Sequence, residues 1–168
     1  MTNEVVNKQN IGNAGEYYLA SRLSANNFVV TITLGRAEKY DILAVNPKGR
    51  TLKISVKTRY LSKIVRFPLS EKDEIGANDD FYYAFVRLNV FEIEPDFWIV
   101  PSRIVNEILA KSSHIYFKER KRRDGGEHKD VGLRNFWLKL TKTSKGLYPE
   151  NWEEELKKYY KNIDILLE

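Results

Sequence analysis

The sequence predicts an α/β fold with a mixed central sheet flanked by helices. Residues 10–27 carry apolar side chains at helical spacing, which predicts an amphipathic helix. Three segments rich in β-branched residues follow and predict neighbouring strands. The nearly all-apolar segment 81–88 is typical of a central strand. A helix, a meander of strands and a later helical crossover together indicate a mixed sheet.

Local signals place the remaining elements in order along the chain. Residues 46–49 (Asn-Pro-Lys-Gly) are a strong turn signal that ends the second strand. Ser70 is an N-cap residue for a short helix, with Asp73 three residues later. Pro101 lies near the first turn of a later helix. The predicted strands span 28–34, 40–45, 51–58, 81–88, 97–100, 115–118 and 136–140, and the later helices span 101 to about 110 and 152 to about 160.

Length and composition indicate a globular protein with one domain, residues 1–168. The chain is 42% hydrophobic and 30% charged, which is typical of a folded domain and not of a disordered one. It has no cysteine, which excludes disulfides, thiolate zinc sites and a cysteine nucleophile. No apolar run approaches the roughly 20 residues that span a bilayer. The N-terminus lacks the pattern of a secretory signal, so we expect a cytoplasmic protein without a membrane partner.

The net charge of +5 allows a polyanionic partner but does not require one. The positive charge is concentrated in a basic segment ahead of residues 124–126 (Asp-Gly-Gly), and this segment either contacts phosphates or forms a solvated hairpin tip. Its cations are Lys118, Arg120, Lys121, Arg122 and Arg123.

Polar residues stand out on two of the predicted strands. Ser55 and Lys57 share one face of the third strand, whereas the apolar residues of that strand point to the other face. Asp41 begins the second strand, where it is either a functional carboxylate or a cap of a turn. Arg59 shares the face of Lys57 and either meets a phosphate or forms an ion pair at the sheet edge.

Glu16 adds a second carboxylate from the first helix. It precedes Ala20 by four residues and Leu23 by seven, so it shares the buried stripe of that helix. A carboxylate on a buried stripe must be paired or bind a metal. The alternative to a metal ligand is a salt bridge, for which Lys57 is a candidate partner.

These residues resemble the active-site skeleton of the PD-(D/E)XK nuclease superfamily. The resemblance rests on Glu16, on residues 40–42 (Tyr-Asp-Ile) and on residues 54–58 (Ile-Ser-Val-Lys-Thr). The opening of residues 11–16 (Ile-Gly-Asn-Ala-Gly-Glu) is similar to small resolvase-like and intron-endonuclease-like members, and so is the segment 97–102. The resemblance covers roughly residues 10–105. It implies a restriction endonuclease-like αβββαβ core over about 10–118, with C-terminal additions over about 119–168.

The resemblance implies a metal-dependent endonuclease that hydrolyses DNA. Asp41 and Glu16 then bind Mg²⁺, with Mn²⁺ as a substitute, and the backbone carbonyl of Val56 is a further ligand. Lys57 positions or activates the attacking water. Arg59 and the basic segment hold the nucleic-acid backbone, and a homodimer places two sites on two strands.

Ser55 departs from the family pattern, because that position normally carries Glu, Asp or Gln. Either the missing acid has moved, or the site has lost catalysis and only binds nucleic acid or a protein partner. Glu71 is the preferred replacement, with Glu74 one turn further on, and the alternative places both on a solvated helical face. A third interpretation is that the charged residues merely form a buried ion network.

Overall fold

The computed structural model describes residues 7–33, 39–60, 66–89 and 93–168, and these form two compact units. The first unit comprises the described parts of 1–62, 80–100 and 159–168, and the second those of 63–79 and 101–158. Each unit therefore combines segments that are separated in sequence. No helix in the described ranges is long and apolar enough to cross a membrane.

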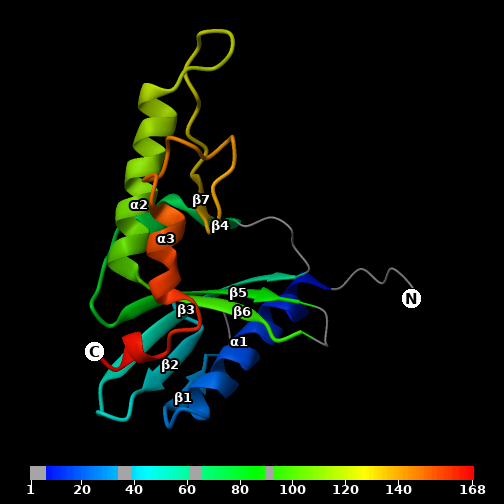
Figure 1. Cartoon of the computed structure of the whole chain (residues 1–168), viewed down its shortest axis with the longest axis vertical. Coiled ribbons are helices and arrows are strands. Elements are labelled where there is room, and N and C mark those ends of the chain that lie inside the picture. The colour runs from blue at the N-terminus through cyan, green and yellow to red at the C-terminus, as the bar shows by residue number, and fades with distance from the viewer. Residues whose placement is uncertain (1–6, 34–38, 61–65, 90–92) are drawn as a thin grey trace. The chain divides into compact units, whose positions relative to one another are not determined.

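The first unit contains a five-stranded mixed sheet, which confirms the predicted fold class (Figure 1). The strand order is β1-β2-β3-β5-β6. The first three strands pair antiparallel, and β3 pairs parallel with β5. The strands are β1 (Val29–Ile32), β2 (Ile42–Val45), β3 (Thr51–Tyr60), β5 (Phe81–Leu88) and β6 (Asp96–Pro101). Leu34, the last residue of the first predicted strand, lies outside the described residues.

Helix α1 (Lys8–Ser24) covers one face of this sheet. The side chain of Asn7 caps its N-terminus by accepting a hydrogen bond from the Gln9 amide at 2.8 Å. The predicted apolar stripe is buried and packs on alternate residues of the central strands. The core of the unit includes Leu19, Ala20, Leu23, Ile42, Leu52, Ile54, Val56, Tyr82, Ala84, Val86, Phe97 and Ile99.

Gly15 sets how closely α1 approaches the sheet. A Cβ atom at this position would overlap the Oγ1 atom of Thr58 on β3 and would lie 2.9 Å from the Cβ of Thr58. Only a residue without a side chain therefore fits at this contact. The neighbouring Glu16 is held beside the sheet as a consequence.

The second unit contains a two-stranded antiparallel sheet of β4 (Arg66–Ser70) and β7 (Leu133–Trp137). The predicted cap at Ser70 is confirmed, because its amide and hydroxyl both donate to Asp73 Oδ2 at 2.8 Å. The capped element is the 3-10 turn η1 (Glu71–Glu74). The sequence did not reveal β4, which consists of only five residues and includes Pro68.

The remaining helices are α2 (Ser102–His114), α3 (Trp152–Leu156), and the short helical turns η3 (Lys157–Tyr159) and η4 (Asp164–Leu166). The strand predicted at 115–118 is wrong, because these residues form the π-helical turn η2 (Ile115–Glu119). The amide of Ile115 donates to carbonyls of Lys111 and Ser112, so the helix continues. Extending an existing helix is easier than nucleating a strand, which overrides the β propensity of Ile115 and Tyr116.

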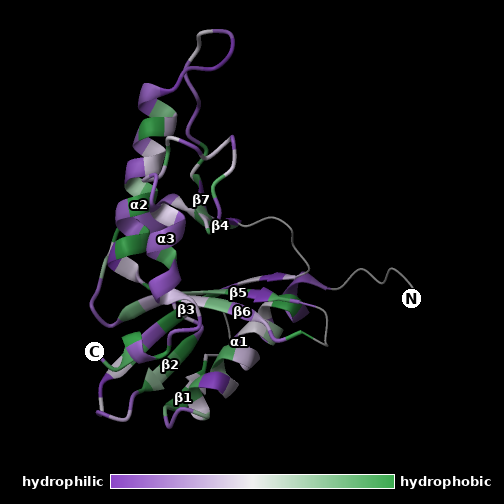
Figure 2. Cartoon of the chain, viewed as in Figure 1, coloured by the Kyte–Doolittle hydropathy of each residue, from purple (hydrophilic) through white to green (hydrophobic). Residues whose placement is uncertain are grey.

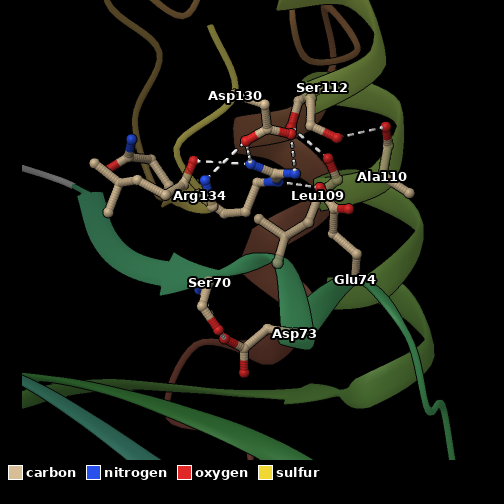
Figure 3. Close-up of polar contacts among 12 residues, drawn as sticks. Ser70, Asp73, Glu74, Leu109, Ala110, Ser112, Asp130 and Arg134 are labelled. Carbon is tan, nitrogen blue, oxygen red and sulfur yellow. Dashed lines mark hydrogen bonds and ion pairs between the residues drawn. The ribbon is translucent and has the colours of Figure 1, made fainter. Parts of the chain in front are cut away.

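A buried arginine organises the second unit (Figure 3). Arg134 is only 6% exposed and forms ion pairs with Glu74 and Asp130. Its two terminal nitrogens donate to the two oxygens of Asp130, each at 2.8 Å. These hydrogen bonds raise the pKa of Arg134, and they lower the pKa of Asp130. The charge of Arg134 is therefore neutralised within the unit.

We expect Gly15→Ala to lower the free energy of unfolding by about 1–3 kcal/mol, since the added methyl group collides with Thr58. Urea denaturation measures this change. Gly12→Ala is the matched control in the same helix, because no atom lies within 4 Å of its added Cβ. The control should stabilise the protein by about 0.5–1 kcal/mol. Equal effects of the two substitutions would contradict the close contact between α1 and β3.

Candidate functional site

The candidate site lies at the N-terminal end of β2, beyond which β3 continues. The paired register of the two strands ends at Ile42 and Ile54, and the amide of Asp41 donates to the carbonyl of Ile54 at 2.9 Å. Strand β3 then runs on to Tyr60 beside β5. In a β-strand, the N–H and C=O groups of one residue point to the same side. Those of Val56 therefore point to the side of β3 on which β2 no longer pairs with it.

The side chain of Asp41 takes the place of the missing strand. Its Oδ2 atom accepts a hydrogen bond from the Val56 amide at 2.6 Å and another from the Ser55 hydroxyl at 3.3 Å. The Oδ1 atom accepts none from the described residues. One carboxylate oxygen is thus used for positioning, and the other is left for a ligand.

Ser55 serves Asp41 as a hydrogen-bond donor. Its side chain is nearly fully buried, with 3% of the residue exposed. A buried hydroxyl needs a partner, and the carboxylate of Asp41 supplies it. Ser55 occupies the position that carries an acid in the family pattern, and here it supports the neighbouring acid Asp41.

Glu16 reaches the same place from α1. Burial is the main reason that the pKa of Glu16 is raised above its ordinary value of 4.5. The negative charge of Asp41 raises this pKa further, whereas the positive charge of Lys57 lowers it. Glu16 therefore lies within electrostatic range of both Asp41 and Lys57.

Lys57 is half-buried on β3 and makes no hydrogen bond or ion pair with the described residues. A direct Glu16–Lys57 salt bridge, the alternative from the sequence, is not formed among them. An ammonium group in this state is available to a ligand. Arg59 lies two residues further along β3. Its Nε atom is buried and has no hydrogen-bond partner in the part of the chain described. Its neighbour across the ladder, Arg87, is instead paired with Asp96.

The oxygen donors at this site suit a hard cation. They are the carboxylates of Asp41 and Glu16, together with the carbonyl of Val56 on the vacated edge of β3. Mg²⁺ takes oxygen ligands and retains several waters, so two carboxylates are a sufficient protein contribution. Nowhere in the described ranges do three or more His, Cys, Asp or Glu residues form a metal-binding group.

The two candidates for a displaced acid both lie in the second unit. The amide of Glu71 donates to the carbonyl of Gly132 at 3.0 Å, and its carboxyl group lies beside the same glycine. Glu74 forms the ion pair with Arg134 described above. Glu74 is therefore committed to a structural interaction, whereas Glu71 is exposed.

The basic segment between η2 and β7 is hydrophilic along its length (Figure 2). Its cations differ in what they contact. Lys121 pairs with Glu127 at 3.1 Å and Arg122 with Asp124 at 3.0 Å, both on the surface. Arg120 donates to the backbone carbonyls of Thr143 and Lys145. Lys118 and Arg123 form no ion pair with the described residues.

The sequence did not reveal how Glu16 is positioned. The responsible contact joins Gly15 and Thr58, neither of which carries a charge or a catalytic function. The sequence signal for this contact is Gly15 in the interior of the helix, next to Glu16. A glycine inside a helix is unfavourable unless close packing requires it.

No protein-family model matches this chain, and no match was found among the curated proteins. Several solved structures are similar to it, among them a homing endonuclease and a Holliday junction resolvase. One is the bacterial homing endonuclease I-Ssp6803I, with 18% identity, a TM-score of 0.47, and coverage of 91% of this chain and 94% of the other. The second is Hjc, a Holliday junction resolvase from the archaeal hyperthermophile Archaeoglobus fulgidus, with 15% identity, a TM-score of 0.43, and coverage of 82% and 87%.

The charge cluster predicts how the pKa of Glu16 responds to its neighbours. Asp41→Asn removes a negative charge, so the pKa of Glu16 should fall, whereas Lys57→Met removes a positive charge, so it should rise. Carbon-13 NMR titration of glutamate side chains measures both shifts.

Glu94→Gln is the control, because Glu94 is not among the charges that act on Glu16. If all three substitutions left the pKa of Glu16 unchanged, the three charged residues would not form one site.

Proposed function

We propose that this protein is a metal-dependent endonuclease that hydrolyses phosphodiester bonds in DNA. One arrangement chiefly supports the proposal: at the N-terminal end of β2 the Val56 amide holds the carboxylate of Asp41, and the charges of Asp41 and Lys57 both act on Glu16. Phosphodiester hydrolysis requires an activated water and a means to offset the negative charge that develops on the phosphate. The cluster contains residue types for both tasks.

Asp41 and Glu16 are the residues that would hold Mg²⁺ or Mn²⁺, together with the Val56 carbonyl. The raised pKa of Glu16 supports this role, because burial and the negative charge of Asp41 both disfavour its charged form, and a bound cation would offset both effects. When bound, the divalent cation supplies the Lewis acidity that offsets charge on the reacting phosphate. Asp41 is already oriented for binding by Val56 and Ser55.

Lys57 holds the attacking water and offsets phosphate charge in this proposal. Its ammonium group makes no hydrogen bond or ion pair with the described residues, and its positive charge acts on Glu16. Arg59 binds the adjacent phosphate through the guanidinium group of its half-buried side chain. Lys118 and Arg123 in the second unit add contacts to the DNA backbone, with Arg120, Lys121 and Arg122 as weaker contributors because they already have partners.

The small size of the protein favours a homodimer in which each copy cuts one strand of a duplex. Glu71 remains the candidate for the displaced acid from its position in the sequence, and its exposed carboxylate is not paired with a cation of the described chain. Location in the cytoplasm would give access to DNA.

A second candidate function is nucleic-acid binding without catalysis. Ser55 favours it, because a hydroxyl replaces an acid and leaves only two carboxylates in the cluster. This function predicts salt-sensitive DNA binding and no cleavage with any divalent metal.

The nuclease proposal predicts that Asp41→Asn and Lys57→Met each reduce the rate of plasmid cleavage in Mg²⁺ by about 10²–10⁴-fold, the range for loss of a positioned catalytic group. Relaxation of supercoiled DNA measures the rate. Lys53→Met is the matched control on the same strand, since Lys53 is exposed and lies over the ring of Tyr40. Wild-type protein that binds but does not cut supercoiled or branched DNA would instead establish the silent binding domain.

The role of Glu71 is tested by the Mg²⁺ dependence of cleavage. Glu71→Gln should raise the Mg²⁺ concentration required for half-maximal rate, because one ligand loses its charge. Glu107→Gln, an exposed position on α2, controls for a general change in net charge. An unchanged Mg²⁺ dependence in Glu71→Gln would leave Asp41 and Glu16 as the complete set of acids.

A further inference from the structure

The second unit contains a cavity that is distinct from the Asp41 cluster. Its volume is about 350 Å³, within the range of sites that hold small molecules. Residues from α2, η2, β7 and the segment before β7 line it. All of these belong to the second unit, so the cavity is formed within a single compact body.

Aromatic rings give this cavity flat faces. The ring of Tyr116 stacks on the imidazole of His128, with 4.3 Å between centroids and 31° between planes. The guanidinium group of Arg66 lies 5.3 Å from the centroid of the Trp137 ring. Rings of this kind are the platforms on which unpaired nucleobases stack.

The charge in the cavity favours an anionic ligand. None of the described residues that line it is acidic. Arg134 lines it too, but the ion pairs with Asp130 and Glu74 neutralise its charge (Figure 3). Arg66 and Lys129 form no ion pair with the described chain, so their positive charge is available.

Asn135 adds a hydrogen-bonding edge. Its backbone carbonyl accepts from the Tyr148 hydroxyl at 2.5 Å, which fixes this part of β7. Its side-chain amide makes no hydrogen bond with the described residues, although it carries both a donor and an acceptor. Such an amide complements the edge of a nucleobase.

We propose that this cavity binds one unpaired nucleotide of a DNA strand. The base stacks on Tyr116 or Trp137 and meets the amide of Asn135, while Arg66 and Lys129 hold the flanking phosphates. The inference depends on the proposed function only in that DNA is the partner, and it requires no catalysis. A free mononucleotide shares the same chemistry, and the experiment distinguishes the two.

The experiment measures binding of three labelled duplexes by fluorescence anisotropy in EDTA, so that no cleavage occurs. One carries a bulged thymidine, the second an abasic bulge, and the third is fully paired. We expect the wild-type protein to bind the thymidine bulge about tenfold more tightly than the abasic bulge, the order expected for one stacked base. Tyr116→Leu and Trp137→Leu should reduce this preference, whereas Tyr17→Leu, at an exposed position on α1, should retain it.

A readout in the wild-type protein does not depend on how well the variants fold. 2-Aminopurine placed at the bulge should lose fluorescence on binding, because stacking quenches it. Equal affinity for the two bulges, or fluorescence that does not fall, would overturn the proposal. Thymidine monophosphate that competes at the concentrations at which bulged DNA binds would assign the cavity to a free nucleotide.

The outcomes also separate this inference from the nuclease proposal. A preference for the base without cleavage in Mg²⁺ would support the cavity and refute the nuclease. Cleavage in Mg²⁺ without any preference for the base would support the nuclease and refute the proposal for the cavity. No binding of any of the duplexes would refute both.

Discussion

The hydrogen bond from the Val56 amide to the carboxylate of Asp41 is the interaction on which the candidate site depends. Strand β3 extends beyond β2, so its backbone groups on that side lose their ladder partners. A buried amide without a partner is strongly unfavourable, and Asp41 satisfies it at 2.6 Å. The end of a strand pair thereby fixes a carboxylate beside the backbone of Val56.

Helix α1 brings the second carboxylate to that point because Gly15 allows it to approach Thr58. This position disfavours the charged form of Glu16, because burial and the negative charge of Asp41 raise its pKa. A raised pKa means that this group contributes stability below its ordinary pKa of 4.5, and this contribution is lost as the pH rises through the higher folded value. At neutral pH the free site therefore holds electrostatic strain, which Lys57 relieves only in part. Placing an acid here reduces stability, and a bound cation would recover it.

The sequence predicted the first unit well because its strands are defined by local periodicity. Segment 81–88 matched β5 in full, and Leu19, Ala20 and Leu23 form the buried stripe of α1. The second unit was harder, because its sheet pairs residues 66–70 with 133–137 and no local pattern reports such a long-range contact. Ile115 and Tyr116 have strand propensities that the preceding helix overrides. The division into two units also depends on contacts between segments distant in sequence.

Ser55 shows why the residue pattern alone leaves the chemistry open. An acid at this position would place another negative charge near Asp41 and Glu16, whereas serine donates a hydrogen bond to Asp41. The substitution reduces repulsion within the cluster and improves the orientation of the remaining acid. It also removes one ligand, so any cation must retain more of its waters. Ser55 therefore lowers the affinity of the cluster for a cation, but it orders the carboxylate of Asp41 better. The balance between these two effects decides whether the cluster catalyses or only binds.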